Sequence, residues 1–243
     1  MQLYYKKKSI FSTISENLEN IMNTPDLTDS YNSNVSTERI TIFESNSEIH
    51  FNGPIDHKSM SNLTNALLDM QARILKKCKK LKRKFSEFEK EKEKETIDDD
   101  DCINIDIKPK PIKLYITTNG GYIYQVFGAI DTIQYMEVPV HTICKGMVAS
   151  AGTLLSLSGK KRYITPNSYM LIHELRGGTW GKFQQIKYSF ENSNKLMDHI
   201  KSMYLTKTKI NAEELEECLK KDIAWDAQTC LQKGLVDEII SNN

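Results

Sequence analysis

The sequence has few cysteines and almost no net charge. Only five of its 243 residues are cysteine, no two are spaced as CxxC, and the odd number leaves one without an internal partner. This usage suggests neither a disulfide framework nor a zinc site, and it favours a reducing compartment. The 33 Lys and Arg nearly cancel the 32 Asp and Glu, giving +1. A protein whose whole surface binds nucleic acid or an anionic membrane is therefore not expected.

Long apolar runs are also missing. The uncharged stretch 146–159 has 14 residues, which is too short to span a bilayer. The first eight residues, Met-Gln-Leu-Tyr-Tyr-Lys-Lys-Lys, contain no apolar segment of the kind found in signal peptides. We therefore expect a soluble, cytoplasmic protein.

Two segments have a composition unsuited to a packed core. Residues 12–37 contain 14 Ser, Thr or Asn among 26, so we predict a mobile N-terminal arm over residues 1–38. A charged insertion covers about 76–110, beginning with seven basic residues among the nine from 76 to 84. This block could bind nucleic acid or act as a localisation signal. A solvated helix extension and loop is favoured, because the acidic run 98–101 cancels its field.

The remainder, residues 39–243, reads as one α/β domain. Strand patterns alternate with helical ones, which implies right-handed βαβ crossovers and a parallel sheet. Strands are predicted at 39–43, 48–51, 113–118, 140–144, 162–165, 168–172 and 234–240, and helices at 55–75 (capped by Ser59 or Ser61), 124–133, 147–158, 183–204, 212–220 and 227–233. Sites in such sheets gather at the carboxyl ends of the strands, where Gly121 and Gly146 are expected.

A serine among small residues is the first candidate for chemistry. Ser150 lies in Gly-Met-Val-Ala-Ser-Ala-Gly, between a predicted strand and a predicted helix. The first amides of that helix have no intrahelical acceptor, so they could stabilise an oxyanion. Gly120 and Gly121 supply a second backbone turn at the end of a neighbouring strand. The alternative is that Ser150 is simply a small residue that permits tight helix–sheet packing.

A nucleophilic serine needs a base, and the base needs an acid that orients it. Of the five histidines, His173 follows a strand directly and is the best placed; the others are His50, His57, His141 and His199. The sequence leaves the orienting acid open among Asp222, Asp226 and Asp237.

The predicted helix 183–204 carries a second signal. Its larger residues alternate steps of three and four, which is typical of a helix–helix contact: Phe183, Ile186, Phe190, Ser193, Met197, Ile200 and Tyr204. The pattern by itself fits packing within the chain and contact with a second copy equally well.

Four motifs resemble, in order and at the same separations, those of the ClpP family, the proteolytic subunit of the Clp protease. Residues 115–121 resemble its YINSPGG, residues 146–152 its GxAASMG, and residues 170–174 its MIHQP. Asp222 stands 12 residues before a Gly-Leu-Val-Asp segment at 234–237, where the family has its third triad member. The resemblance implies a ClpP/crotonase-like fold of repeated β-β-α and βαβ units with a long protruding handle helix.

The resemblance, which runs from about residue 49 to 240, also implies site residues. The nucleophile is Ser150, the base His173 and the orienting acid Asp222, with Asp226 a rival because an Ile-Ala-Trp-Asp segment follows Asp222. Backbone amides of Gly121 and Ala151 would form the oxyanion hole. The substrate-binding residues would be Gly120, Gly177 and Gly178, the last two in a segment where a peptide can pair with the backbone.

The family further implies an oligomer and partners. Its handle helix joins two heptameric rings, so we expect a homo-oligomer of ClpP type, stacked as a double ring, that hydrolyses unfolded proteins. A Clp-type ATPase unfoldase would be the partner, and the peptidase itself would need no cofactor and no metal.

Two motif prolines are replaced, by Asn119 and Leu175. The alternative is therefore a catalytically inactive structural or regulatory subunit. An acyl-CoA enzyme of crotonase type and a Ser–Lys signal-peptide peptidase are less favoured.

Overall fold

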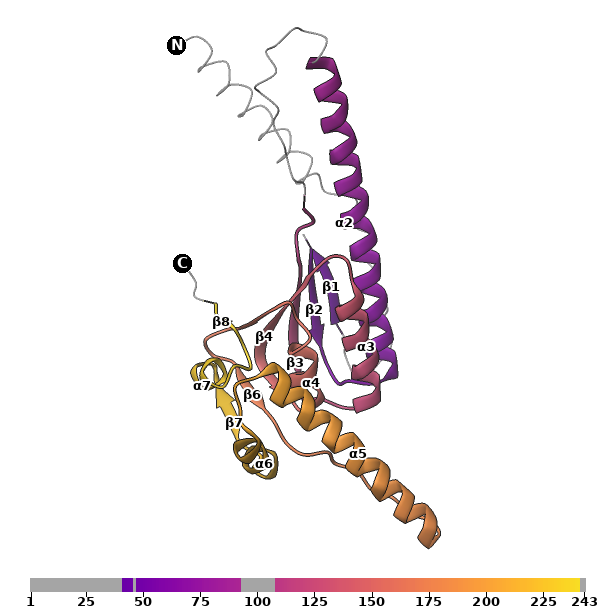
Figure 1. The fold of residues 1–243 in the computed structure, drawn as a ribbon, viewed down its shortest axis with the longest axis vertical. Helices are drawn as coiled ribbons and strands as arrows, with labels where there is room; N and C mark the ends of the chain where they lie inside the picture. Colours follow the sequence, from indigo (N-terminus) through magenta and orange to yellow (C-terminus); the bar gives the residue numbers. More distant parts are fainter. Residues whose placement is uncertain (1–40, 46, 93–107, 241–243) are drawn as a thin grey trace. The chain divides into compact units, whose positions relative to one another are not determined.

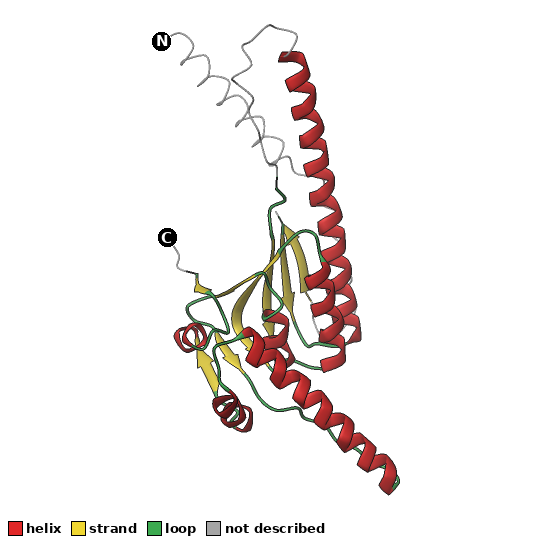
Figure 2. Cartoon of the chain, viewed as in Figure 1, coloured by secondary structure: helices red, strands yellow, loops and turns green. Residues whose placement is uncertain are grey.

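A computed structural model describes residues 41–45, 47–92 and 108–240 of the chain (Figures 1 and 2). The predicted arm, residues 1–38, and residues 93–107 of the predicted insertion lie outside this part. No helix within the described ranges combines the length and the hydropathy needed to cross a membrane.

The described residues form an eight-stranded, mostly parallel sheet. Its main path runs β1-β2-β3-β4-β5-β8, and the pairs from β2 to β8 along this path are all parallel. Strand β1 pairs antiparallel with β2, while β6 pairs with β4 and with β7. The strands are β1 (Thr41–Ser45), β2 (Glu48–Asn52), β3 (Ile112–Thr118), β4 (Val140–Ala149), β5 (Lys161–Ile164), β6 (Tyr169–Leu171), β7 (Ala224–Asp226) and β8 (Glu238–Ile239). The predicted α/β class and parallel sheet are confirmed.

Strand β4 is longer than predicted and changes partner along its length. Its first half pairs with β5, and Met147–Ala149 pairs in parallel with β6. Gly146, at φ +68°, stands between the two halves. The helix predicted at 147–158 is therefore wrong over its first residues. The helix that follows, α4, covers only Ala151–Ser156, because pairing with a neighbouring strand overrides the local preference of small apolar residues.

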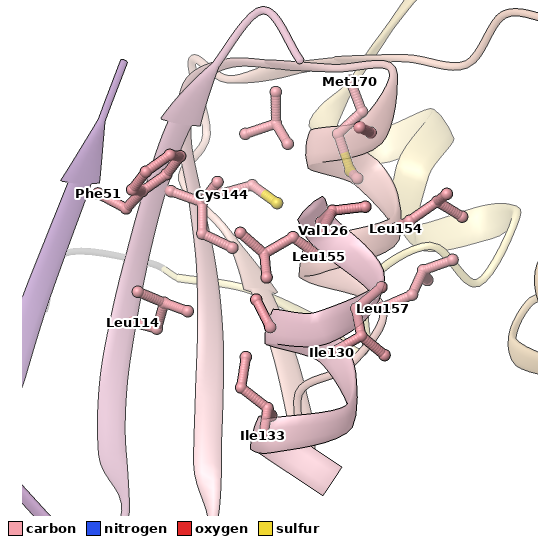
Figure 3. Packing of buried hydrophobic residues seen from close by; sticks show 14 of the residues in the cluster. Phe51, Leu114, Val126, Ile130, Ile133, Cys144, Leu154, Leu155, Leu157 and Met170 are labelled. Atoms are coloured by element: carbon pink, nitrogen blue, oxygen red, sulfur yellow. The ribbon is translucent and has the colours of Figure 1, made fainter. Parts of the chain in front are cut away.

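Helices α2 (His57–Lys92) and α3 (Ile123–Tyr135) lie side by side against one face of the sheet, and α4 contacts both α3 and the strands (Figure 1). Their apolar faces meet the inward side chains of the strands in one core (Figure 3). Fully burying a Leu, Ile or Phe side chain contributes about 1.5–3 kcal/mol. Core members drawn in Figure 3 include Phe51, Leu114, Val126, Ile130, Ile133, Cys144, Leu154, Leu155, Leu157 and Met170.

Helix α2 starts and ends differently from the prediction. Asp56 accepts from the Ser59 amide at 2.7 Å while the Asp56 amide donates to Ser59 Oγ at 2.9 Å, a reciprocal cap. Ser59 is thus the third helical residue rather than the cap. The helix then continues through the basic run to Lys92, since Lys, Arg and Glu are good helix formers. Residues 76–84 are thus helical and mostly exposed, as the favoured interpretation expects.

Helix α5 (Phe183–Lys207) divides into an exposed half and a packed half. Ile200 and Tyr204 are buried, whereas Phe183 and Phe190 are largely exposed. The predicted seam is therefore a core contact only near the C-terminal end of α5. The chain closes with the short helices α6 (Ala212–Lys220) and α7 (Ala227–Gln232).

Candidate active site

Ser150 occupies a strained turn between β4 and α4. Its φ of 56° is positive, which among the described non-glycine residues is shared only with Ser47. Its amide donates to the Leu171 carbonyl at 2.9 Å, and its carbonyl accepts from the Thr153 amide at 3.0 Å. A non-glycine residue in such a conformation costs about 1–3 kcal/mol and persists only where the surroundings hold it. Here the end of β6 and the first turn of α4 hold it.

Gly120 approaches Ser150 more closely than any other residue type could. A Cβ at Gly120 would lie 2.6 Å from Ser150 Cβ and 2.9 Å from the Ala149 carbonyl oxygen, and the φ of Gly120 is +93°. Any side chain would therefore push the turn after β3 away from the serine. The role of Gly120 in the site is first of all this close approach.

Backbone hydrogen bonds hold the turn that contains Gly121 against Ile55. Ile55 donates to the Gly120 carbonyl at 2.9 Å and accepts from the Tyr122 amide at 2.8 Å. These bonds use the groups on either side of Gly121, so the Gly121 N–H itself is not bonded to Ile55. The Ala151 N–H is in the first position of α4, which has no intrahelical acceptor. An amide without an intrahelical acceptor, next to a serine hydroxyl, suits a developing oxyanion.

His173 lies beside Ser150 through strand pairing. Ala149 is paired with Leu171 on two adjacent parallel strands, so Ser150 stands one residue and His173 two residues beyond this pair. The His173 side chain is only 12% exposed. Burial lowers its pKa, the Arg176 guanidinium lowers the pKa further, and Asp222 and Glu174 partly oppose this. The imidazole is therefore held neutral to lower pH than an ordinary histidine, as a general base requires.

The acid beside His173 is Asp222. Leu171 pairs antiparallel with Ala224, so His173 and Asp222 each stand two residues beyond this pair on facing strands. His173 Nδ1 is 3.6 Å from Asp222 Oδ1. This separation is within ion-pair range but beyond a hydrogen bond, and the buried Nδ1 has no hydrogen-bond partner.

The other two candidate acids are engaged elsewhere. Asp226 pairs with Tyr169 at the opposite end of β7, where its Oδ1 accepts from the Thr229 amide at 2.8 Å and caps α7. Asp237 accepts from the side chain of Arg162. The geometry thus brings only Asp222, of the three, to His173.

The remaining histidines make contacts away from Ser150. His50 stacks on Tyr115 with ring centroids 4.4 Å apart, His141 lies beside Tyr163, His199 meets the edge of Phe127, and His57 Nδ1 is 3.4 Å from Gln125 Oε1. Among the described residues, no three His, Cys, Asp or Glu side chains are grouped so that they could hold a metal ion.

Gly177 and Gly178 lie in the exposed segment that follows His173. A Cβ at either position would meet nothing within 4 Å, so this backbone is open on its side-chain faces. Sequence reasoning missed Arg176, which precedes these glycines and donates to Asp222 Oδ2. The one sequence signal for it was a basic residue three positions after the candidate base.

We expect Gly120→Ala to lower the free energy of unfolding by more than about 1 kcal/mol, because the added Cβ meets Ser150 and φ is positive. Gly128, on the exposed side of α3 with open space at its Cβ, is the matched control. Gly128→Ala should raise the same free energy by about 0.5–1 kcal/mol. Urea unfolding measures both; equal stability of Gly120→Ala and wild type would contradict the packing described.

Comparison with protein families identifies the family of the chain. A family model described as Clp protease matches residues 86–243, that is, 158 of the 243 residues. The match begins within the last turns of α2 and includes Ser150, His173 and Asp222. The mixed α/β architecture with a mostly parallel sheet fits the ClpP/crotonase-like fold. The chain therefore belongs to the Clp protease family.

Proposed function

We propose that this protein is a serine endopeptidase that hydrolyses peptide bonds of unfolded proteins with Ser150, His173 and Asp222. The observation that carries the proposal is the convergence of three strand ends. A strained serine follows β4, a histidine with a lowered pKa and a side chain 12% exposed follows β6, and a carboxylate precedes β7 at 3.6 Å from that histidine. A serine that only filled space beside a helix would not need a positive φ.

In the proposed mechanism Ser150 Oγ attacks the peptide carbonyl carbon while His173 takes the hydroxyl proton. The negative charge that develops on the carbonyl oxygen is stabilised by the amides of Gly121 and Ala151. Collapse of the tetrahedral intermediate breaks the C–N bond, and His173 returns the proton to the leaving amine. Water then attacks the acyl-enzyme by the same route, releasing the acid and the free serine.

Asp222 has the orienting role in this mechanism. Its carboxylate holds the imidazole in the tautomer with the proton on Nδ1 and stabilises the imidazolium. The 3.6 Å separation must shorten for this, and catalytic hydrogen bonds often tighten only when substrate is bound. The substrate would lie extended along the open segment with Gly177 and Gly178, pairing through its backbone.

The proposed assembly is a homo-oligomeric chamber. Trp180 is 98% exposed, and Phe183 and Phe190 continue an aromatic surface along α5. Exposed aromatic residues gathered on one element are typical of a protein–protein contact. The occupant we propose is α5 of a second copy, as in stacked rings, with a Clp-type ATPase supplying unfolded chains.

If a Clp-type ATPase is the partner, a folded substrate should be degraded only when such an ATPase and ATP are added. ATP-independent degradation would argue against this partner.

Fluorophosphonate labelling tests the nucleophile. We expect wild-type protein to gain one adduct by intact mass, and Ser150→Ala and His173→Ala to lose about 10⁴-fold or more in peptide cleavage. The matched control is Ser158→Ala, since the Ser158 hydroxyl only donates to the Leu155 carbonyl and lies at the far end of α4. Absence of an adduct on the folded, assembled wild type would favour the catalytically inactive subunit instead.

The pH dependence tests the base. His173 accepts a proton only when neutral, and its pKa lies below the ordinary 6.5 because of burial and then Arg176. The rate should therefore fall as the pH drops through this lowered pKa, with a midpoint below 6.5. The measurement is kcat/KM for a short peptide between pH 4.5 and 8; an acid limb centred at or above 6.5 would exclude His173 in the environment described.

The size of the assembly tests the contact through α5. Replacing Phe183 and Phe190 together by Ser should shift the sedimentation profile from the large assembly to smaller species, because the buried apolar area between copies is lost. Tyr135, 90% exposed at the end of α3, provides the control. Tyr135→Ser should leave the profile unchanged, and a profile that neither variant alters would refute the proposed contact.

A further inference from the structure

Arg176 connects the open segment after β6 with the candidate acid. It lies three residues after His173 and directly before Gly177, and its guanidinium Nη2 donates to Asp222 Oδ2. Both side chains are more than half exposed. The ion pair therefore spans two segments that are 46 residues apart in the chain and that both border His173.

The Asp222 carboxylate has two different neighbours, one at each oxygen. Oδ2 accepts from Arg176, and Oδ1 faces His173 Nδ1 at 3.6 Å. Asp222 itself stands in the short connection between α6 and β7, where the Ile223 amide donates to the Lys221 carbonyl. Within the described part of the chain, Arg176 is the one residue recorded as donating a hydrogen bond to this carboxylate.

We infer that Arg176 is a positioning residue, which holds one oxygen of Asp222 so that the other is presented to His173. This inference rests on the proposed function, because it assigns Arg176 a role only if Asp222 orients the base. Arg176 does not reach the reacting atoms and acts through the carboxylate. Its place beside Gly177 and Gly178 means that a peptide bound along this segment would lie next to the ion pair.

The charges around His173 give this role a measurable consequence. Three charged side chains act on the His173 imidazole. Glu174 and Arg176 belong to the same segment as His173, and Asp222 belongs to the connection before β7. Arg176 opposes protonation of His173 through its own charge, and this effect on the His173 pKa is larger than the opposing effect of Asp222. Loss of the arginine charge should therefore leave His173 easier to protonate even if Asp222, whose effect is smaller, is no longer held in place.

The test is the rate of fluorophosphonate labelling of Ser150 in the full-length protein as a function of pH. In Arg176→Gln the acid limb should move to higher pH, so that labelling at pH 6 relative to pH 8 is roughly two- to fivefold slower than in wild type. Arg176→Lys keeps the charge and should restore most of the wild-type profile.

Lys221→Gln is the matched control, because it removes a cation adjacent to Asp222 whose Nζ contacts Glu217 Oε2 at 3.1 Å instead. Its profile should follow wild type. An acid limb of Arg176→Gln that superimposes on wild type, or one that Lys221→Gln reproduces, would overturn the inference.

A second readout separates this inference from the proposed function. NMR titration of ring-labelled histidines, with His173 assigned by its loss in His173→Ala, needs no activity. A higher His173 midpoint in Arg176→Gln than in wild type supports the electrostatic link, and equal midpoints refute it. Wild-type protein that is never labelled at Ser150 would instead refute the proposed function, whatever the histidine titration gives.

Discussion

The pairing of the last three residues of β4 is the constraint on which the candidate site depends. Met147–Ala149 is held between β3 on one side and β6 on the other, with Val148 paired to both Thr118 and Met170. Strands β3, β4 and β6 end within a few residues of this register, so the turns that follow the three strands lie at the same edge of the sheet. The glycines after β3, Ser150 after β4 and His173 after β6 are brought together by backbone hydrogen bonds rather than by side-chain contacts.

A second set of bonds connects Ser150 with α5. Thr153 Oγ1 is 2.6 Å from the Ser150 carbonyl oxygen and 2.6 Å from the Tyr204 hydroxyl, so one buried hydroxyl joins the strained turn to the packed half of α5. Burial raises the pKa of Tyr204, which therefore stays a neutral hydrogen-bonding group. The other half of α5 carries exposed aromatic residues. If copies assemble through that half, the same helix would link the contact between copies, by way of Tyr204 and Thr153, to the turn that carries Ser150.

The three charged or titratable side chains of the site differ in their exposure to solvent. His173 is largely buried, while Asp222 and Arg176 are exposed to solvent and to salt. An exposed ion pair contributes little to stability, about 0–1 kcal/mol. Its importance here is geometric, because the carboxylate stands on a short connection and has few other contacts. The strength of the His173–Asp222 interaction is consequently open to change when a peptide occupies the neighbouring segment.

The sequence by itself determined the local elements and the order of the motifs. Periodicity predicted the parallel α/β sheet and the helix over 183–204, and the resemblance predicted the family that the comparison then showed. The roles of Ser150, His173 and Asp222 were predicted from the same motifs and stay predictions. The strand and helix segments and the motifs are each local in the chain, so composition and spacing are enough to predict them.

Tertiary structure alone decided four other features. These are the extension of β4 to Ala149, the hydrogen bonding of the turn at Gly120 and Gly121 to Ile55, the placing of Asp222 rather than Asp226 beside His173, and the contact of Arg176 with Asp222. Each depends on a partner far away in the sequence: β6, Ile55, β6 again, and a residue 46 positions distant. A window of neighbouring residues cannot contain that information, because register and ion pairing are set by which segments the folded sheet places side by side.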